Sequence, residues 1–178
     1  MSSVAAAASL APAPGARAAN PAPAFRAVDP QGAAALALLA QAALEARALY
    51  PELFTADSPS PVNAPPGEGD VYLVAFDGDT PVACGALRRI DVATAEVRRL
   101  FVLAPARRRG LARATLAALE DAAIGLGYDT LLLETGHRQQ PAMALYDAAG
   151  FTRIPPFGPY AGDPTSVCFG KRLATAHG

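Results

Sequence analysis

Cysteine is scarce in this sequence. Cys84 and Cys168 are the only two among 178 residues, and neither belongs to a CxxC pair or to a cluster of cysteine and histidine. Disulfide scaffolds and structural zinc sites need several suitably spaced thiol or imidazole side chains, so this composition argues against both. We expect the two cysteines to be small buried side chains, and we expect no metal site.

An excess of charge of one sign is also lacking. The 15 basic and 16 acidic residues give a formal net charge of -1, which leaves no overall field to hold the protein on nucleic acid or on an anionic membrane. No stretch reaches the roughly 20 uninterrupted apolar residues that a membrane-spanning helix needs. We therefore expect neither nucleic acid nor a membrane as a partner, and any phosphate must be recognised locally.

Bulky side chains are missing from most of residues 1–24, which are almost all Ala, Pro, Ser and Gly. Such a segment offers nothing to a core, and we expect a disordered tail. A secretory signal is the alternative, but no Lys or Arg precedes its short apolar run and Pro12 and Pro14 interrupt it, so we expect a cytoplasmic protein. The chain is 52% hydrophobic, and we predict one domain over 25–173 with a short tail at 174–178.

The first half of this domain is predicted to hold a helix and an antiparallel meander of strands. An Ala- and Leu-rich run over 31–50 ends at Pro51 and predicts the helix. The Pro-rich stretch that follows suits a mobile loop or a short helix, and such loops often carry substrate contacts. Asp77-Gly78 marks a tight hairpin turn. The predicted strands are 25–29, 70–76, 81–90 and 95–103.

The second half alternates helices with strands. Apolar spacing predicts a helix over 110–125, and a second helix over 141–149 ends at Gly150, which suits a left-handed C-terminal cap. The strand-helix-strand order implies a parallel crossover after the meander, so the fold class is a mixed α/β sheet of the α+β kind. In the helix over 110–125, the residues expected to face inward are Leu111, Leu116, Leu119 and Ile124. The remaining predicted strands are 130–134, 151–154 and 166–173.

One segment around Pro105 runs from a strand directly into a helix N-terminus. Free backbone N–H groups at such a helix start, together with the positive end of the helix dipole, can hold a pyrophosphate. Gly110 and Ala112 lack bulk, so phosphates can approach the main chain, and the arginines of 107–109 can add hydrogen bonds. Neither the GxxxxGK(S/T) pattern of a Walker loop nor the GxGxxG of a dinucleotide fold occurs in this segment. For an Arg triplet alone, a solvated run of charge is the alternative.

Two patterns in this half point to one family. Arg107, Gly110 and Ala112 fit the pattern Q/RxxGxG/A, and residues 139–151 fit NxxAxxLYxxxGF, with Gln139 in place of Asn offering the same amide donors and acceptor. The matching positions of the second pattern are Ala142, Leu145, Tyr146, Gly150 and Phe151. In both segments the sequence resembles the GCN5-related N-acetyltransferase (GNAT) family.

The resemblance implies a GNAT-like acyl-CoA N-acyltransferase fold. It implies an acetyl-CoA-dependent N-acetyltransferase that moves an acetyl group directly to the primary amine of a small molecule or peptide, and it is compatible with a homodimer. A longer acyl donor stays open, and a non-catalytic acyl-CoA-binding sensor is the alternative function. The cofactor-binding residues that it implies are Leu100, Phe101 and Val102 through the main chain, Arg107, Arg108, Arg109, Gly110, Leu111 and Ala112 at the pyrophosphate, and Gln139 and Tyr146.

For catalysis, the resemblance implies that Tyr146 is the general acid that protonates the departing sulfur. A core aromatic on an amphipathic helix is the alternative. Glu96 resembles the general base of histone-acetylating members, and an ion-paired surface glutamate is the other interpretation. Glu134 is a second candidate base, with structural pairing as its alternative, and a water chain is a third route. His137 is either a helpful titratable group or a solvated loop residue.

The acceptor amine is expected to bind near residues 50–54 and the late loop around Phe157 and Tyr160. Arg88 and Arg98 lie on neighbouring predicted strands. They either recognise a substrate carboxylate, which would favour an amino acid-like acceptor, or are exposed charges.

Overall fold

The computed structural model of the chain describes residues 22–174, which fold around one sheet of seven strands. The predicted tails lie almost wholly outside these residues, and the first strand already begins at Ala24. The strands are β1 (Ala24–Ala27), β2 (Val71–Asp77), β3 (Thr80–Arg89), β4 (Thr94–Val102), β5 (Thr130–Gly136), β6 (Thr152–Ile154) and β7 (Ser166–Arg172). The helices are α1 (Ala33–Leu49), α2 (Leu111–Gly125) and α3 (Gln140–Ala148), with 3-10 turns η1 (Pro51–Leu53), η2 (Ala104–Ala106) and η3 (Gly158–Tyr160).

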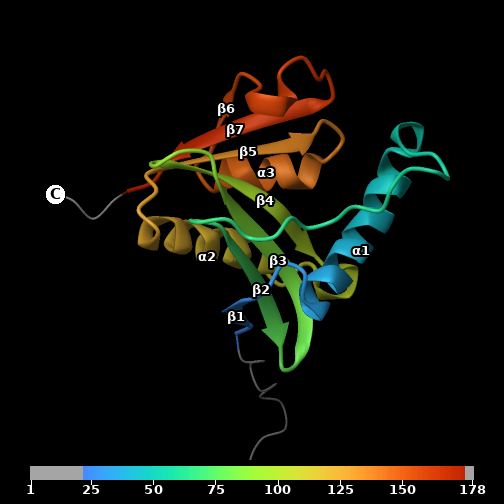
Figure 1. Cartoon of the computed structure of the whole chain (residues 1–178), viewed down its shortest axis with the longest axis horizontal. Helices are drawn as coiled ribbons and strands as arrows, with labels where there is room; N and C mark the ends of the chain where they lie inside the picture. The colour runs from blue at the N-terminus through green and yellow to red at the C-terminus, as the bar shows by residue number, and fades with distance from the viewer. Residues whose placement is uncertain (1–21, 175–178) are drawn as a thin grey trace, which may run out of the picture.

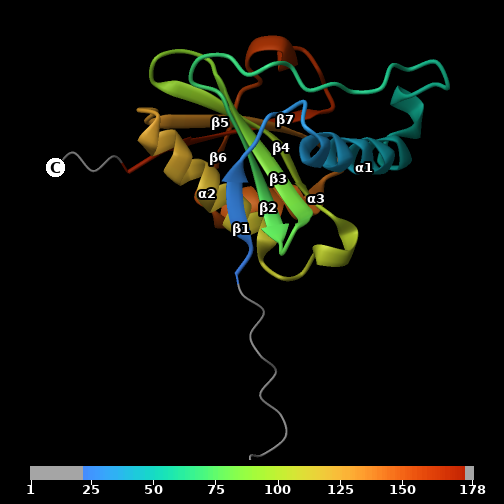
Figure 2. The ribbon, with the colours of Figure 1, turned by 60° about the horizontal axis from the view of Figure 1, so that its bottom comes forward.

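The strands form the order β1-β2-β3-β4-β5-β7-β6 (Figure 1). β1 to β4 make an antiparallel meander with β1 at the edge beside β2 (Figure 2). β2 turns into β3 through Gly78, whose φ of 62° is the left-handed conformation that a tight turn needs. β4 and β5 are parallel, with α2 as their crossover, and β7 inserts between β5 and β6. The predicted meander and crossover are confirmed.

β4 and β5 separate partway along their length. Their pairing stops after Val97 opposite Leu133, although both strands continue. Just beyond that point β4 carries a bulge, where Arg99 has a φ of 57° and the register against β3 shifts between Cys84 and Ala86. A bulge bends its strand and increases the local twist. Figure 1 shows the result, with β5 and β7 crossing the molecule at a steep angle to β2 and β3.

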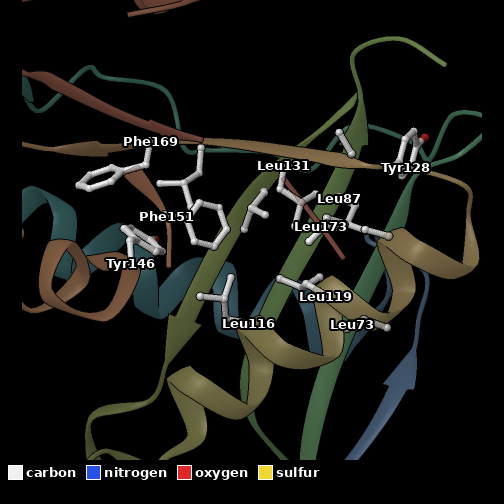
Figure 3. Packing of buried hydrophobic residues seen from close by; sticks show 14 of the residues in the cluster. Leu73, Leu87, Leu116, Leu119, Tyr128, Leu131, Tyr146, Phe151, Phe169 and Leu173 are labelled. Carbon is white, nitrogen blue, oxygen red and sulfur yellow. The ribbon is translucent and has the colours of Figure 1, made fainter. Parts of the chain in front are cut away.

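Helices cover both faces of the sheet. Leu73 of β2 packs in the cluster that contains Leu119 of α2 and Tyr146 of α3 (Figure 3). Its neighbour Tyr72 points to the other face and packs with Leu38 of α1. Successive side chains of a strand alternate between faces, so the sheet separates α1 from α2 and α3.

Helix α2 buries a slightly different stripe from the predicted one. Leu111, Leu116 and Leu119 are buried as predicted, but Ile124 is 39% exposed and Ala123 is fully buried in its place. At 3.6 residues per turn, neighbouring residues lie about 100° apart on a helix, so burying Ala123 turns Ile124 toward the flank. The inward placement predicted for Ile124 is therefore wrong.

The two cysteines are buried and unpaired, so the prediction of small buried side chains is confirmed. Among residues 22–174, no helix has the length and apolar character needed to cross a bilayer. Over the same residues, no group of three or more His, Cys, Asp or Glu side chains is placed to hold a metal ion.

Candidate active site

A cleft of about 960 Å³ opens where β4 and β5 diverge, and we call it the β4–β5 cleft. Its walls are the second half of β4, the start of α2, the end of β5 and helix α3. The predicted cofactor-binding residues that line it are Leu100, Phe101, Val102, Arg107, Arg108, Gly110, Leu111, Ala112, Gln139 and Tyr146. The fold thus brings both sequence patterns to one cleft. Arg109 is the one predicted cofactor-binding residue that does not line it.

The start of α2 leaves backbone donors free at this cleft. Gly110 is the N-cap residue, with a φ of 76°, and no side chain caps the helix. The first helical hydrogen bond runs from the Ala114 N–H to the Gly110 carbonyl at 3.0 Å, so the N–H groups before it have no partner within the helix. Such a helix start is suited to bind a phosphate group.

Two of the three arginines before α2 are held by acidic side chains. Arg107 donates from Nε to the Val102 carbonyl at 3.0 Å and from Nη2 to the Glu45 carboxylate at 2.7 Å. Arg109 pairs with Asp77 at the end of β2, with 3.0 Å between nitrogen and oxygen. Arg107 therefore ties helix α1 to the rim of the cleft, whereas Arg109 fastens the loop to the β2–β3 hairpin.

Tyr146 projects from α3 and is 6% exposed. Its ring packs against Phe151 and Phe169, with ring centroids 6.0 and 5.6 Å away. Burial, and then the negative charge of Glu134, raises the pKa of the Tyr146 hydroxyl to about 12. Tyr146 is therefore both part of the core, as the structural alternative held, and a protonated hydroxyl in the wall of the cleft.

Glu134 lies on β5, in the wall of the same cleft, and is partly buried. The Ser166 hydroxyl donates a hydrogen bond to its carboxylate at 2.8 Å. Burial raises the pKa of the Glu134 carboxyl, and the hydrogen bond from Ser166 opposes that shift. A carboxylate with a raised pKa in the wall of this cleft is suited to accept a proton there.

Glu96, the other predicted base, lies on β4 but does not line the β4–β5 cleft. It is 7% exposed, and the Tyr160 hydroxyl donates to its carboxylate at 2.5 Å. Burial, followed by this hydrogen bond, raises the pKa of the Tyr160 hydroxyl. Val97 and Arg98 line the cleft but Glu96 does not. The alternative of an ion-paired surface residue does not hold, because Glu96 is buried and the Tyr160 hydroxyl is its hydrogen-bond partner.

The residues predicted to bind the acceptor are dispersed. The Tyr50 hydroxyl accepts a hydrogen bond from the Arg138 backbone N–H at 3.1 Å, so Tyr50 is held just beyond the end of β5. His137 is exposed and meets the Tyr50 ring edge-on, with 6.0 Å between ring centroids. Phe157 and Tyr160 contact each other, with ring centroids 5.3 Å apart. None of these side chains lines the β4–β5 cleft, and none lines the cavity beside helix α1.

The two arginines proposed to recognise a carboxylate differ in their surroundings. Arg88 is exposed on β3 opposite Glu96, whereas Arg98 reaches the β4–β5 cleft. Only Arg98 of the two therefore lines the candidate site.

A second cavity of about 720 Å³, which we call the α1 cavity, lies between helix α1, the loop that follows it and the bulged end of β4. The two cavities meet between the bulge, the end of α1 and the start of α3, because they share Arg99, Leu100, Phe101, Glu45, Leu49 and Gln139. Its lining residues are Leu39, Ala42, Ala43, Glu45, Ala46, Arg47, Ala48, Leu49, Phe54, Pro59, Pro61, Tyr72, Cys84, Arg99, Leu100, Phe101 and Gln139. Phe54 alone of the predicted 50–54 stretch belongs to it.

The bulge itself is held by contacts that sequence reasoning missed. Arg99 donates from Nε to Asn63 Oδ1 at 3.1 Å and from Nη2 to the Val62 carbonyl at 3.0 Å. Its own carbonyl accepts from the Cys84 thiol at 3.2 Å, and Asn63 donates to the Pro30 carbonyl at 2.8 Å. A positive φ at a residue other than glycine is uncommon, and these contacts keep Arg99 in it. No sequence motif marks Asn63, because it pairs with a residue 36 positions away.

Comparison with known proteins identifies the family of this chain. A family model described as the acetyltransferase (GNAT) family matches residues 34–151, which include both sequence patterns and every wall of the β4–β5 cleft. The chain belongs to the GNAT family. The expected family and fold are thereby confirmed.

Individual relatives agree with the family model. The IAA acetyltransferase of Azospirillum brasilense is 43% identical over 104 residues, which make up 57% of this chain and 67% of that protein. A candidate acyl-CoA N-acyltransferase from Klebsiella pneumoniae superposes with a TM-score of 0.70 at 30% identity, covering 85% of this chain and 98% of that one. A GNAT family acetyltransferase from Elizabethkingia anophelis with acetyl-CoA bound shares the fold at a TM-score of 0.61 and 15% identity, over 86% and 99% of the two chains. This GNAT protein is therefore an acetyltransferase.

Proposed function

We propose that this acetyltransferase uses acetyl-CoA and transfers the acetyl group directly to the primary amine of a small molecule or peptide. The observation that carries the proposal is the junction of two cavities at the β4 bulge. The β4–β5 cleft offers a helix start for phosphates, and the α1 cavity opens beside Leu100 and Phe101. Two substrates that enter from opposite sides would meet at this point, as direct transfer requires.

The β4–β5 cleft has the groups that acetyl-CoA needs. The uncapped N–H groups at the start of α2 suit the pyrophosphate, and Arg108 can add charge at the rim. Beyond Val97, β4 has no pairing with β5, so main-chain groups of Leu100 to Val102 on that side can bind the pantetheine and polarise the thioester carbonyl. The acetyl-CoA bound to the Elizabethkingia protein, which shares this fold, supports acetyl-CoA as the co-substrate.

The reaction forms one bond, breaks one bond and transfers two protons. The amine lone pair forms a bond to the carbonyl carbon, and the bond from that carbon to sulfur breaks. Tyr146 donates its hydroxyl proton to the departing sulfur, and Glu134 accepts the proton that the amine loses, directly or through water. Of the two candidate bases, we favour Glu134 because it lines the cleft. We assign Glu96 a structural role, as the acceptor of the hydrogen bond from the Tyr160 hydroxyl.

A binding experiment separates the enzyme from the sensor alternative. Calorimetry with acetyl-CoA is run beside a thiol-release assay on a panel of small amines and peptides. Binding together with turnover is the expected result. Binding without turnover on any amine would support a sensor, and no binding would contradict the proposed co-substrate.

A variant tests the phosphate position in the same assay. Ala112→Glu adds a carboxylate at the start of α2, where it would repel a pyrophosphate, and we expect at least about a tenfold rise in the Kd for acetyl-CoA. Ala117→Glu is the matched control, because Ala117 is exposed on the same helix and does not line the cleft. Equal Kd values for the two variants would place the phosphates elsewhere.

A further inference from the structure

The α1 cavity indicates the chemical class of the acceptor. We propose that the acceptor is a monoamine with an apolar body, such as an alkyl chain or an aromatic ring, and not a polyamine or an aminoglycoside. This inference rests on the proposed acetylation of amines and adds the identity of the group attached to the nitrogen.

The charged groups of the α1 cavity are already engaged with protein partners. Glu45 accepts from Arg107 at 2.7 Å. Arg47 donates to the carbonyls of Thr55 and Ser58 at 3.3 and 2.9 Å. A polyamine or an aminoglycoside needs free carboxylates for its further ammonium groups, because an unpaired charge is costly to remove from water.

Arg99, the remaining charged residue of the lining, is engaged in the same way. Its guanidinium donates to Asn63 and to the Val62 carbonyl, as described for the bulge. Arg47 and Arg99 thus keep their positive charge, and the lining of the cavity, all of it within the described part of the chain, offers no uncommitted carboxylate to a second ammonium group on the substrate.

The rest of the wall is mostly hydrocarbon. Four alanines of α1, at positions 42, 43, 46 and 48, leave room that larger side chains would fill. Phe54 and the prolines at 59 and 61 face them from the loop after α1. A volume of about 720 Å³ is within the range of small-molecule sites, which are typically lined by apolar side chains.

The geometry of the junction gives the acceptor its orientation. The α1 cavity meets the β4–β5 cleft at Leu100 and Phe101, where the proposed mechanism puts the thioester carbonyl. An amine nitrogen must lie at this junction to react, so the body of the acceptor extends away from it along α1 toward Phe54. The single polar end of a monoamine then meets the reacting groups, and its apolar end meets the apolar wall.

A series of amines tests this class. With acetyl-CoA saturating, kcat/KM is measured by thiol release for propylamine, butylamine, pentylamine, hexylamine and phenethylamine, and for spermidine, lysine and kanamycin. We expect kcat/KM to rise about fourfold for each methylene buried along the alkyl series. Higher kcat/KM for spermidine, lysine or kanamycin would overturn the apolar class while leaving amine acetylation intact. No turnover on any amine despite acetyl-CoA binding would overturn both.

Two variants of α1 test the cavity wall. Ala42→Phe fills the α1 cavity, and we expect it to lower kcat/KM for hexylamine at least tenfold and to affect propylamine less. Leu44→Phe is the control, because Leu44 is 61% exposed and lines neither cavity. The Kd for acetyl-CoA should stay unchanged in both, which shows that each variant is folded. Unchanged kcat/KM for hexylamine in a folded Ala42→Phe would overturn the proposal.

Discussion

At the scale of single residues, burial acts in the same direction on Tyr146 and Glu134. The pKa of Tyr146 is raised to about 12, so the hydroxyl keeps its proton at any pH where an enzyme is usually assayed. The pKa of Glu134 is raised as well, so its carboxyl ionises at a higher pH than an ordinary glutamate, for which the pKa is about 4.3. One group is thereby kept as a proton donor, and the other becomes a better proton acceptor.

A pH profile tests the role of Glu134. The ionised carboxylate is the active form of a base, so kcat/KM should rise as pH increases through the raised pKa of Glu134. Glu134→Gln should lower kcat/KM about 100-fold and remove this acid limb. Glu96→Gln is the comparison, and we expect it to have the smaller effect and to keep the limb. The opposite order of effects would identify Glu96 as the base.

The sequence motifs identify some residues of the candidate site and miss others for a physical reason. Gly110 and Tyr146 stand within short patterns whose spacing a single chain displays. The contact of Glu96 with Tyr160 spans 64 positions, and the contact of Glu45 with Arg107 spans 62. Neither pair has a local signature, because tertiary packing alone brings its members together.

At the scale of elements, the bulge of β4 and the loop after α1 depend on each other. Asn63 is buried at 6% exposure and joins Arg99 of the bulge to Pro30 ahead of α1. We call these contacts of Asn63 with Arg99 and Pro30 the Asn63 clamp. The composition of the loop predicts a connection after α1 but does not predict this clamp. The order of the strands is likewise only partly predictable. The sequence predicts a final strand but does not show that β7 inserts between β5 and β6.

Removing the clamp should destabilise the fold and the site together. Asn63→Ala leaves the Arg99 Nε and the Pro30 carbonyl without their partner, and we expect the free energy of unfolding to fall by about 1–3 kcal/mol. Urea unfolding measures this change. Ser60→Ala, at an exposed position of the same loop, is the control. If both variants unfold at the same urea concentration, the clamp contributes nothing to stability.

At the scale of the whole molecule, the β4–β5 cleft and the α1 cavity meet at the bulged end of β4. The order of helices and strands and the parallel crossover follow from periodicity and turn residues, and these predictions are confirmed. The divergence of β4 and β5 has no comparable signal, because it depends on the bulge at Arg99 and on tertiary contacts from Asn63. The meeting point of the cavities, which carries the proposed function, therefore becomes visible only in the folded chain.

The most direct test of this account is the kcat of Tyr146→Phe on the best amine of the panel, measured beside its Kd for acetyl-CoA. Phenylalanine keeps the ring that packs on Phe151 and Phe169 and removes only the proton donor. The account predicts an unchanged Kd and a kcat about 100-fold lower than that of the wild type. A wild-type kcat in a variant that binds acetyl-CoA normally would contradict the assignment of Tyr146 as the acid in the β4–β5 cleft.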